Sequence, residues 1–270
     1  MPELTIVLDV ARYRLRRLEM ANLVAAIAIM LALQLPAPEL LVRTLFAVLL
    51  NLLVYLNNDY FDLDDDLATH SRDRAKTEYL ATHRAAAVRA QLGLLGLLGG
   101  LALAWGGGLP WALVAGAGVC WLYSAVLKRR PFVDVLAMMI WGVAMPAVGV
   151  PPGYPQAWQL LGQLGLFSAV FETIQVLRDR EIDAPRGITT TAVVLGPART
   201  RALARGLMLL SGVYAAWCFH PLLLLPATAA AMLPIPRGDL QPYWNRVRLL
   251  LGPTLLLECA LVWSRAGAGG

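Results

Sequence analysis

Long apolar runs separated by short charged segments make up most of this sequence of 270 residues. About 20 predominantly apolar residues suffice for one helix to cross a lipid bilayer. Only 15% of the residues are charged and 58% are hydrophobic, whereas a soluble domain has about 25% charged residues. We therefore predict an all-α, polytopic membrane protein. Nine membrane-spanning helices are predicted, at residues 18–35, 40–57, 85–105, 111–127, 133–150, 157–177, 202–217, 222–233 and 249–263.

The distribution of Lys and Arg predicts how the chain is oriented. The loops after the second, fourth, sixth and eighth predicted spans hold most of these residues, whereas loops 106–110 and 151–156 hold none. Cytoplasmic loops carry the excess of Lys and Arg, so we expect a cytoplasmic N-terminus in a multi-pass protein of the cell (inner) membrane. Arg43 and Arg265 are the exceptions. This pattern explains the net charge of +5 without a nucleic acid as partner.

Two regions are distinguished by composition. Residues 1–17 are basic and amphipathic, which is typical of a helix that lies on the membrane surface. Residues 18–265 form a single predicted transmembrane domain. Cys120, Cys218 and Cys259 all lie in apolar runs without metal-ligand spacing, so we interpret them as small buried hydrophobic residues.

The first acidic motif, residues 58–66, directly follows the second predicted span and reads NDYFDLDDD. If that helix continues, Asp59, Asp62 and Asp66 are three and four residues apart and share one face. Carboxylates at this spacing repel one another unless a cation lies among them. Oxygen ligands suit Mg²⁺, which binds through one or two carboxylates plus a substrate phosphate. We predict these three residues as Mg²⁺ ligands; the alternative is an acidic loop in water.

The second acidic motif lies at the end of the sixth predicted span, where residues 178–183 read RDREID. Asp179 and Asp183 lie one helical turn apart, and the same face continues back through Gln175 to Glu172. An ionisable group inside a membrane span is costly and therefore indicates function. Glu172 is a candidate for an acceptor pocket or a proton relay, and Asp179 and Asp183 are further candidate metal ligands. The alternative for both aspartates is ion pairing with the nearby arginines.

Basic residues near the predicted cytoplasmic face are candidates for binding a diphosphate. The fourth predicted span ends in YSAVLKRR, and Arg72 lies in the loop after the first acidic motif. Lys binds phosphate as a point charge and Arg as a planar fork. With Mg²⁺ held by both motifs, cleavage of the C–O bond of a prenyl diphosphate would release pyrophosphate and leave an allylic carbocation. Asp59, Asp62, Asp179 and Asp183 are the predicted catalytic residues; anchoring at the membrane edge is the alternative for the cations.

The chain resembles the UbiA superfamily of intramembrane prenyltransferases over nearly its whole length. Residues 58–66 match N-D-x-x-D-x-x-x-D, residues 179–183 match D-x-x-x-D, and Tyr123 and Lys128 lie at the end of the fourth span as in that family. The resemblance implies a nine-helix bundle around a central cavity. It also implies that Asn58 and the five aspartates together bind Mg²⁺ and the diphosphate, and that Lys128 or Arg129 contacts the diphosphate. The two motifs would then face each other across one cavity.

The acceptor is open at this point. Family members often carry an Asn-Arg-Pro segment after the first motif, but residues 68–76 contain no proline, and the Tyr-to-Lys spacing is one residue longer than in quinone-pathway members. A hydrophobic, aromatic or lipid-like acceptor is expected. One alternative is a terpene cyclase that acts on the prenyl diphosphate without an acceptor, and a second is a membrane transporter that uses the intramembrane carboxylates as an ion path.

Overall fold

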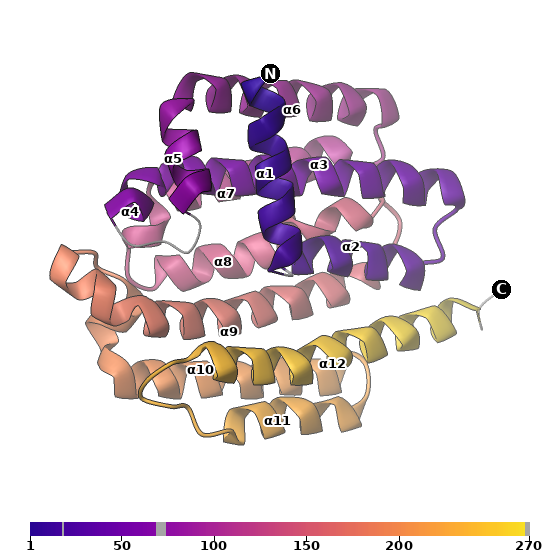
Figure 1. Cartoon of the computed structure of the whole chain (residues 1–270). Helices are drawn as coiled ribbons and strands as arrows, with labels where there is room; N and C mark the ends of the chain where they lie inside the picture. The colour runs from indigo at the N-terminus through magenta and orange to yellow at the C-terminus, as the bar shows by residue number, and fades with distance from the viewer. Residues whose placement is uncertain (18, 69–73, 268–270) are drawn as a thin grey trace. The chain divides into compact units, whose positions relative to one another are not determined.

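The computed structural model describes residues 1–17, 19–68 and 74–267, and every regular element within these ranges is a helix, which confirms the all-α prediction (Figure 1). The chain forms two compact units that interleave along the sequence. Unit 1 comprises Met1–Ile27, Ala37–Ala125 and Ala144–Pro152. Unit 2 comprises Ala28–Pro36, Val126–Val143 and Gly153–Gly270. The two acidic motifs therefore belong to different units.

Unit 1 is built around the long helix α3 (Ala37–Phe61), which packs against α6 (Arg84–Trp105) and α7 (Leu109–Ala125). Two short helices, α4 (Leu63–Ala68) and α5 (Arg74–Thr82), connect α3 to α6. Figure 1 shows the N-terminal helix α1 (Pro2–Arg16) crossing α3 and α6, both of which it contacts. The 3₁₀ helix η2 (Pro146–Gly149) also contacts α3 and α7.

Helix α1 follows ordinary rules for helix ends. Pro2 occupies the first turn with Glu3, and Arg14 and Arg16 lie in the last turn, where their charges complement the helix dipole. Ile6 and Val10 are buried in an apolar cluster with residues of α3, α4, α5 and α6: Leu56, Leu63, Leu80, Ala86, Ala87 and Ala90. Leu4, Leu8 and Leu15 are exposed on the same helix. Helix α1 is thus packed against unit 1, and its contact with a membrane surface stays a prediction.

Unit 2 contains four helices that pack side by side: α9 (Ala157–Asp183), α10 (Thr191–Cys218), α11 (Leu224–Met232) and α12 (Gln241–Gly267). Helix α8 (Val133–Ala144) and the 3₁₀ helices η1 (Leu127–Arg129), η3 (Ala184–Arg186) and η4 (Pro221–Leu223) complete it, and α2 (Ala21–Ala32) crosses the unit boundary. A Cβ atom at Gly142 of α8 would lie 2.1 Å from Ser168 Oγ of α9. Only glycine permits this close approach of α8 and α9.

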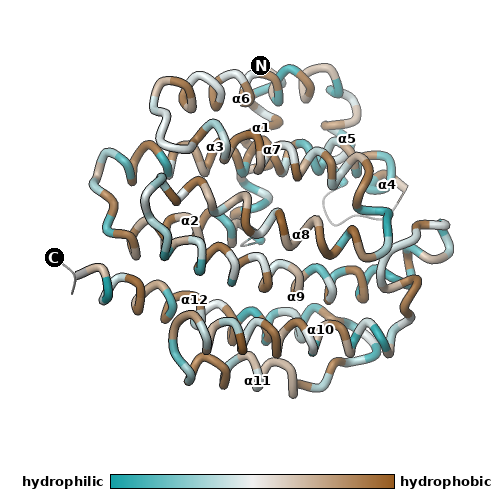
Figure 2. The backbone as a smooth tube through the Cα atoms, turned by 180° about the vertical axis from the view of Figure 1, so that it is seen from behind, coloured by the Kyte–Doolittle hydropathy of each residue, from teal (hydrophilic) through white to brown (hydrophobic). Residues whose placement is uncertain are grey.

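Each of the nine predicted spans coincides with a helix, but the count of nine spans is not confirmed. Within the part of the chain that the structure describes, four helices could cross a membrane by length and composition: Ala37–Phe61, Arg84–Trp105, Ala157–Arg186 and Gln241–Ala266. Four shorter apolar helices are Ala21–Ala32, Leu109–Ala125, Val133–Gly149 and Pro221–Met232. Helix α10 includes the predicted span 202–217 but begins earlier, at Thr191, contains a kink at Gly196–Pro197 and carries Arg199, Arg201 and Arg205. Figure 2 shows hydrophilic residues mainly near helix ends and hydrophobic residues along the helix middles.

Candidate active site

The first acidic motif keeps helical phase across the junction of α3 and α4. The assigned helices break at Asp62, yet Asp62 N donates to Asn58 O at 2.9 Å and Asp66 N donates to Asp62 O at 2.8 Å. Residues 58, 62 and 66 therefore succeed one another at one-turn intervals, as an α-helix requires. The expected continuation of the helix through the motif is confirmed, with a local bend at Asp62.

Asn58 orients the carboxylate of Asp62. The Asn58 side-chain amide donates to Asp62 Oδ2 at 3.0 Å, and the Asn58 carbonyl oxygen accepts from Ser124 Oγ of α7 at 3.5 Å. Tyr123, beside Ser124, is buried in the same unit. Ser124 was not predicted as a site residue, because a serine at the end of an apolar helix has no distinguishing sequence signal.

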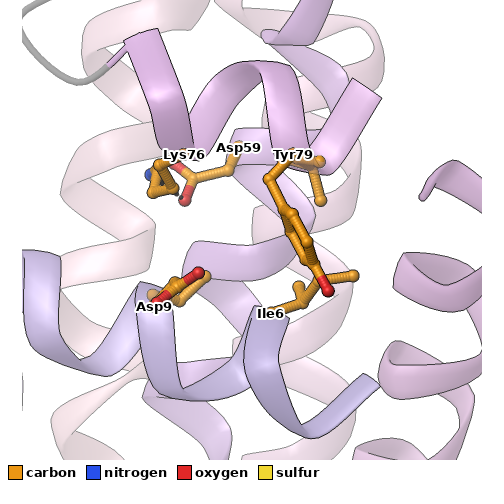
Figure 3. A pocket seen from close by; sticks show the side chains of 7 residues that line it. Ile6, Asp9, Asp59, Lys76 and Tyr79 are labelled. Carbon is orange, nitrogen blue, oxygen red and sulfur yellow. Dashed lines mark hydrogen bonds and ion pairs between the residues drawn. The ribbon is translucent and has the colours of Figure 1, made fainter. Parts of the chain in front are cut away.

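Asp59 has a different environment from Asp62. Its side chain is 7% exposed, and each carboxylate oxygen accepts from a cation: Oδ1 from Arg14 Nη2 at 2.5 Å and Oδ2 from Lys76 Nζ at 2.7 Å. Figure 3 shows Asp59 beside Lys76 on one side of a small pocket and Asp9 on the other side. Both oxygens of Asp59 thus accept from cations on α1 and α5, and its role as a metal ligand stays a prediction.

The two cations are themselves held by aromatic rings. The Arg14 guanidinium lies 4.4 Å from the Tyr55 ring centroid, and the Lys76 ammonium lies 4.1 Å from the Tyr13 ring centroid. Arg14 also pairs with Glu19 at 2.7 Å. Burial alone would lower the pKa of Arg14, but the carboxylates of Asp59 and Glu19 outweigh it and raise the pKa. Arg14 therefore stays charged in a largely buried position.

Sequence reasoning gave Arg14 no site role. Four arginines in residues 1–17 predict a surface helix, and their spacing does not distinguish the one that contacts Asp59. The predicted diphosphate ligand Arg72 lies outside the described residues, in the gap 69–73. Lys76, which follows this gap, contacts Asp59.

The second acidic motif lies on one continuous helix, α9, together with Glu172 and Gln175, as expected. Glu172 is buried at 3% exposure, whereas Gln175 is exposed, so these two side chains occupy different surroundings. Asp179 is partly exposed and pairs with its neighbour Arg178, with Nε to Oδ1 at 2.7 Å. This contact is the arginine pairing that we considered as the alternative for Asp179, and it occupies the carboxylate with a neighbour on its own helix.

The predicted diphosphate cations Lys128 and Arg129 lie in η1, which belongs to unit 2 with the second motif. Lys128 is partly buried and Arg129 is exposed. Arg130 N closes the 3₁₀ turn by donating to Leu127 O at 3.0 Å. The two cations therefore lie on a short structured turn between α7 and α8.

The donor chemistry of the first motif suits Mg²⁺. Among residues 1–17, 19–68 and 74–267, no group of three or more His, Cys, Asp or Glu side chains could by itself hold a metal ion. Mg²⁺, however, keeps several waters and needs only one or two protein carboxylates when it also binds substrate phosphate. Asp62, oriented by Asn58, and Asp66 on the same helical face supply such oxygen ligands. This set fits Mg²⁺ bound together with a diphosphate.

The sequence is similar to one family of proteins over most of its length. The model of the UbiA prenyltransferase family matches residues 21–248. The chain is 31% identical over 252 residues to the 1,4-dihydroxy-2-naphthoate octaprenyltransferase of Mycobacterium tuberculosis (strain H37Rv), a match that covers 83% of this chain and 82% of the relative. Both acidic motifs lie within the region that the family model matches.

Solved structures share the fold. A UbiA homologue from Archaeoglobus fulgidus bound to GPP and Mg²⁺ has a TM-score of 0.74 at 16% identity, with 99% of each chain covered. The same homologue bound to DMAPP and Mg²⁺ has a TM-score of 0.75, again at 16% identity and 99% coverage of each chain. A structure of digeranylgeranylglyceryl phosphate synthase has a TM-score of 0.74 at 16% identity, covering 98% of this chain and 100% of that one. At this identity the likeness establishes the fold alone.

Proposed function

The chain belongs to the UbiA prenyltransferase family, and on that premise we propose that this integral membrane protein transfers a prenyl group from a prenyl diphosphate to an aromatic acceptor of the dihydroxynaphthoate class. The acceptor class is supported by the relative from M. tuberculosis, which is named for 1,4-dihydroxy-2-naphthoate and an octaprenyl group and matches along most of both chains. Pyrophosphate is the second product.

The observation that carries the proposal is the arrangement of Asn58, Asp62 and Asp66. The Asn58 amide donates to one oxygen of Asp62. The backbone hydrogen bonds of residues 62 and 66 place these two aspartates one helical turn apart, on the same side of the helix. A helix end that presents oriented carboxylates from an apolar span is suited to a metal–diphosphate headgroup attached to an apolar chain. This arrangement supports a prenyl diphosphate as the donor.

We propose that Asp62 and Asp66 of the first motif and Asp179 and Asp183 of the second hold the metal ions that accompany the diphosphate. Bound Mg²⁺ would stabilise the negative charge that develops on the leaving pyrophosphate. Lys128 and Arg129, with Arg72 as a further candidate outside the described residues, would neutralise the remaining phosphate charge. Tyr123, at the end of α7, is a proposed substrate contact.

The proposed reaction breaks the bond between C1 of the prenyl chain and the diphosphate oxygen, and the electron pair of this bond leaves with pyrophosphate. The resulting allylic cation is attacked by a ring carbon of the acceptor, and the ring then loses a proton. Apolar helices would exclude the water that otherwise quenches the cation. Glu172, buried on α9, is a proposed acceptor ligand or proton acceptor, and Gln175 is a proposed acceptor contact from the same helix.

We assign Asp59 a different role from Asp62. Because Arg14 and Lys76 occupy both of its oxygens, Asp59 is proposed to anchor α1 and α5 at the first motif and not to bind the metal ion. Removing one partner from a buried ion pair leaves an uncompensated charge, which is strongly destabilising. Asp59 would thus support the site by holding its surroundings together.

The proposal is tested by product analysis with the full-length protein in liposomes. The protein would be incubated with Mg²⁺, prenyl diphosphates of several chain lengths and a panel of acceptors that includes 1,4-dihydroxy-2-naphthoate, and products would be identified by mass spectrometry. We expect a prenylated naphthoate and an equal amount of pyrophosphate. A cyclic hydrocarbon formed without acceptor would instead support a cyclase. Absence of both pyrophosphate and product would overturn the proposal.

A further inference from the structure

A buried hydrogen-bonded link joins two loops of unit 2 close to the proposed phosphate-binding residues. Asp134, in the first turn of α8, and Thr191, the first residue of α10, are each 0% exposed. Thr191 N donates to Asp134 Oδ2 at 2.7 Å, and the Thr191 hydroxyl donates to Asp134 Oδ1. Val135 N also donates to Asp134 Oδ1, at 2.8 Å. We call the Asp134–Thr191 pair the latch.

One side of the latch holds the segment that bears Lys128 and Arg129. Phe132 N donates to Thr191 Oγ1 at 2.6 Å, and Asp134 N donates to Arg130 O at 3.0 Å. Phe132 has a φ of 67°, which is unfavourable for a bulky side chain and persists only where the surroundings impose it. The turn between η1 and α8 is thus held in a strained conformation by its hydrogen bond to Thr191.

The other side of the latch continues into the second acidic motif. Helix α9 ends at Asp183, and Ile188 N donates to Asp183 O at 3.1 Å across the turn that leads to α10. Gly187, at the centre of this turn, has a φ of 70°, which favours glycine. Thr191 begins α10 directly after this turn. The latch therefore connects the cation-bearing turn with the turn that follows Asp179 and Asp183.

We infer that Asp134 and Thr191 are positioning residues, which hold Lys128 and Arg129 at a fixed place relative to Asp179 and Asp183 for binding of the diphosphate. The inference rests on the proposed function of these four residues. Turns that must be ordered when a ligand binds reduce its affinity, and turns that are already ordered do not. Asp134 itself binds neutral donors of Thr191 and Val135, so it acts through these turns and not on the substrate.

Thr191→Val and Thr191→Ser form the matched test pair. Valine keeps the shape of threonine but loses the hydroxyl that bonds both Phe132 N and Asp134, whereas serine keeps the hydroxyl. Using full-length protein in detergent with Mg²⁺, we would measure the Kd of inorganic pyrophosphate by calorimetry and the KM and kcat for the prenyl diphosphate. Thr191→Val is expected to raise Kd and KM about tenfold, as loss of a buried hydrogen bond predicts. Its kcat should change much less, and Thr191→Ser should restore both constants.

The control is Thr254→Val in α12, because Thr254 is also buried but its hydroxyl donates to Leu250 O of its own helix. Wild-type Kd and KM in Thr191→Val, with or without a lower unfolding temperature, would overturn the inference. Should that variant not fold, Asp134→Asn tests the same link by the same constants. If the wild-type protein binds pyrophosphate but transfers no prenyl group, the proposed function is refuted, and the comparison of Kd values still tests the latch. If the wild-type protein does not bind pyrophosphate, both proposals are refuted.

Discussion

Two aspartates of the first acidic motif have different contacts in the fold although they look equivalent in sequence. Asp59 and Asp62 are both aspartates on consecutive turns, and spacing predicts both as metal ligands. In the fold, one contact of Asp62 is with the side-chain amide of Asn58 in the preceding turn, while Asp59 is buried between Arg14 and Lys76 from two other helices. Because Asp59 is buried between two cations from other helices, we propose that it supports the site and that Asp62 binds the metal ion.

Replacing Asp62 by asparagine should abolish the metal-dependent step. We expect kcat/KM for the prenyl diphosphate to fall about 100-fold or more, in line with losses at metal and electrostatic sites, and the Mg²⁺ concentration for half-maximal rate to rise. Pyrophosphate release at varied Mg²⁺ measures both quantities. Asp64→Asn is the matched control, because Asp64 is exposed and pairs with Arg84 at the surface. Near-normal activity in Asp62→Asn would refute its assignment as a ligand.

Replacing Asp59 by asparagine should act mainly on stability. Lys76 would lose the carboxylate that it contacts in a buried site, and Arg14 would keep only Glu19. We expect the free energy of unfolding to fall by about 3–5 kcal/mol. Unfolding in detergent, followed by circular dichroism, measures this loss. The Mg²⁺ requirement of the remaining folded enzyme should match the wild type. A shifted Mg²⁺ requirement like that of Asp62→Asn would instead identify Asp59 as a metal ligand.

At the scale of elements, one arginine joins α3, the turn after α6 and η2 in unit 1. Arg43 of α3 is 0% exposed and donates to Glu39 at 2.5 Å, to Val148 O at 2.8 Å and to Gly107 O at 2.6 Å. Gly107 has a φ of 54°, which favours glycine, and a Cβ there would also lie 2.8 Å from the Arg43 guanidinium. Arg43 departs from the charge pattern of the loops because it satisfies buried carbonyl groups and does not face water.

Arg43→Met should destabilise the protein without changing the chemistry. The substitution removes the donor of two carbonyls and the cation paired with Glu39, which keeps only the neutral donor Trp105 Nε1. We expect a loss of about 3–5 kcal/mol in the free energy of unfolding. The first acidic motif lies at the opposite end of α3, roughly 22 Å away at 1.5 Å per residue, so KM below the unfolding temperature should be unchanged. Arg265→Met is the control, since Arg265 is exposed and contacts only carbonyls at the end of α10. Equal stability of both variants would contradict this role of Arg43.

At the scale of the whole molecule, the charge pattern predicts an orientation in the membrane. The C-terminal ends of α3, α7 and α9 carry the acidic motifs and the turn with Lys128, whereas the connections after α6 and α8 lack charge. We propose that the former ends, and the N-terminus, face the cytoplasm of a cell-membrane protein. The nine-span arrangement of residues 18–265 as a single domain belongs to the same proposal.

Reporter fusions test this orientation. A fluorescent protein that matures in the cytoplasm should be active when fused after Arg186, and alkaline phosphatase should be inactive there. Fusion after Gly108 should give the reverse result, because this connection is predicted to lie outside. Matching activity of one reporter at both positions would contradict the orientation, since an even number of crossings would then separate them.

The sequence by itself determined the class of fold, the positions of the helices and the two acidic motifs, because apolar runs and one-turn spacings are local properties of a chain. It could not determine the partners of Asp59, the buried position of Arg43 or the bonds between Asp134 and Thr191. Most of those contacts join residues that are distant in sequence. The sequence pattern does not distinguish these residues from their neighbours: an arginine in an amphipathic helix, a lysine in a basic loop and a threonine at a helix start are all common. Only tertiary packing brings them together, and burial then makes each contact strong enough to set the role of the residue.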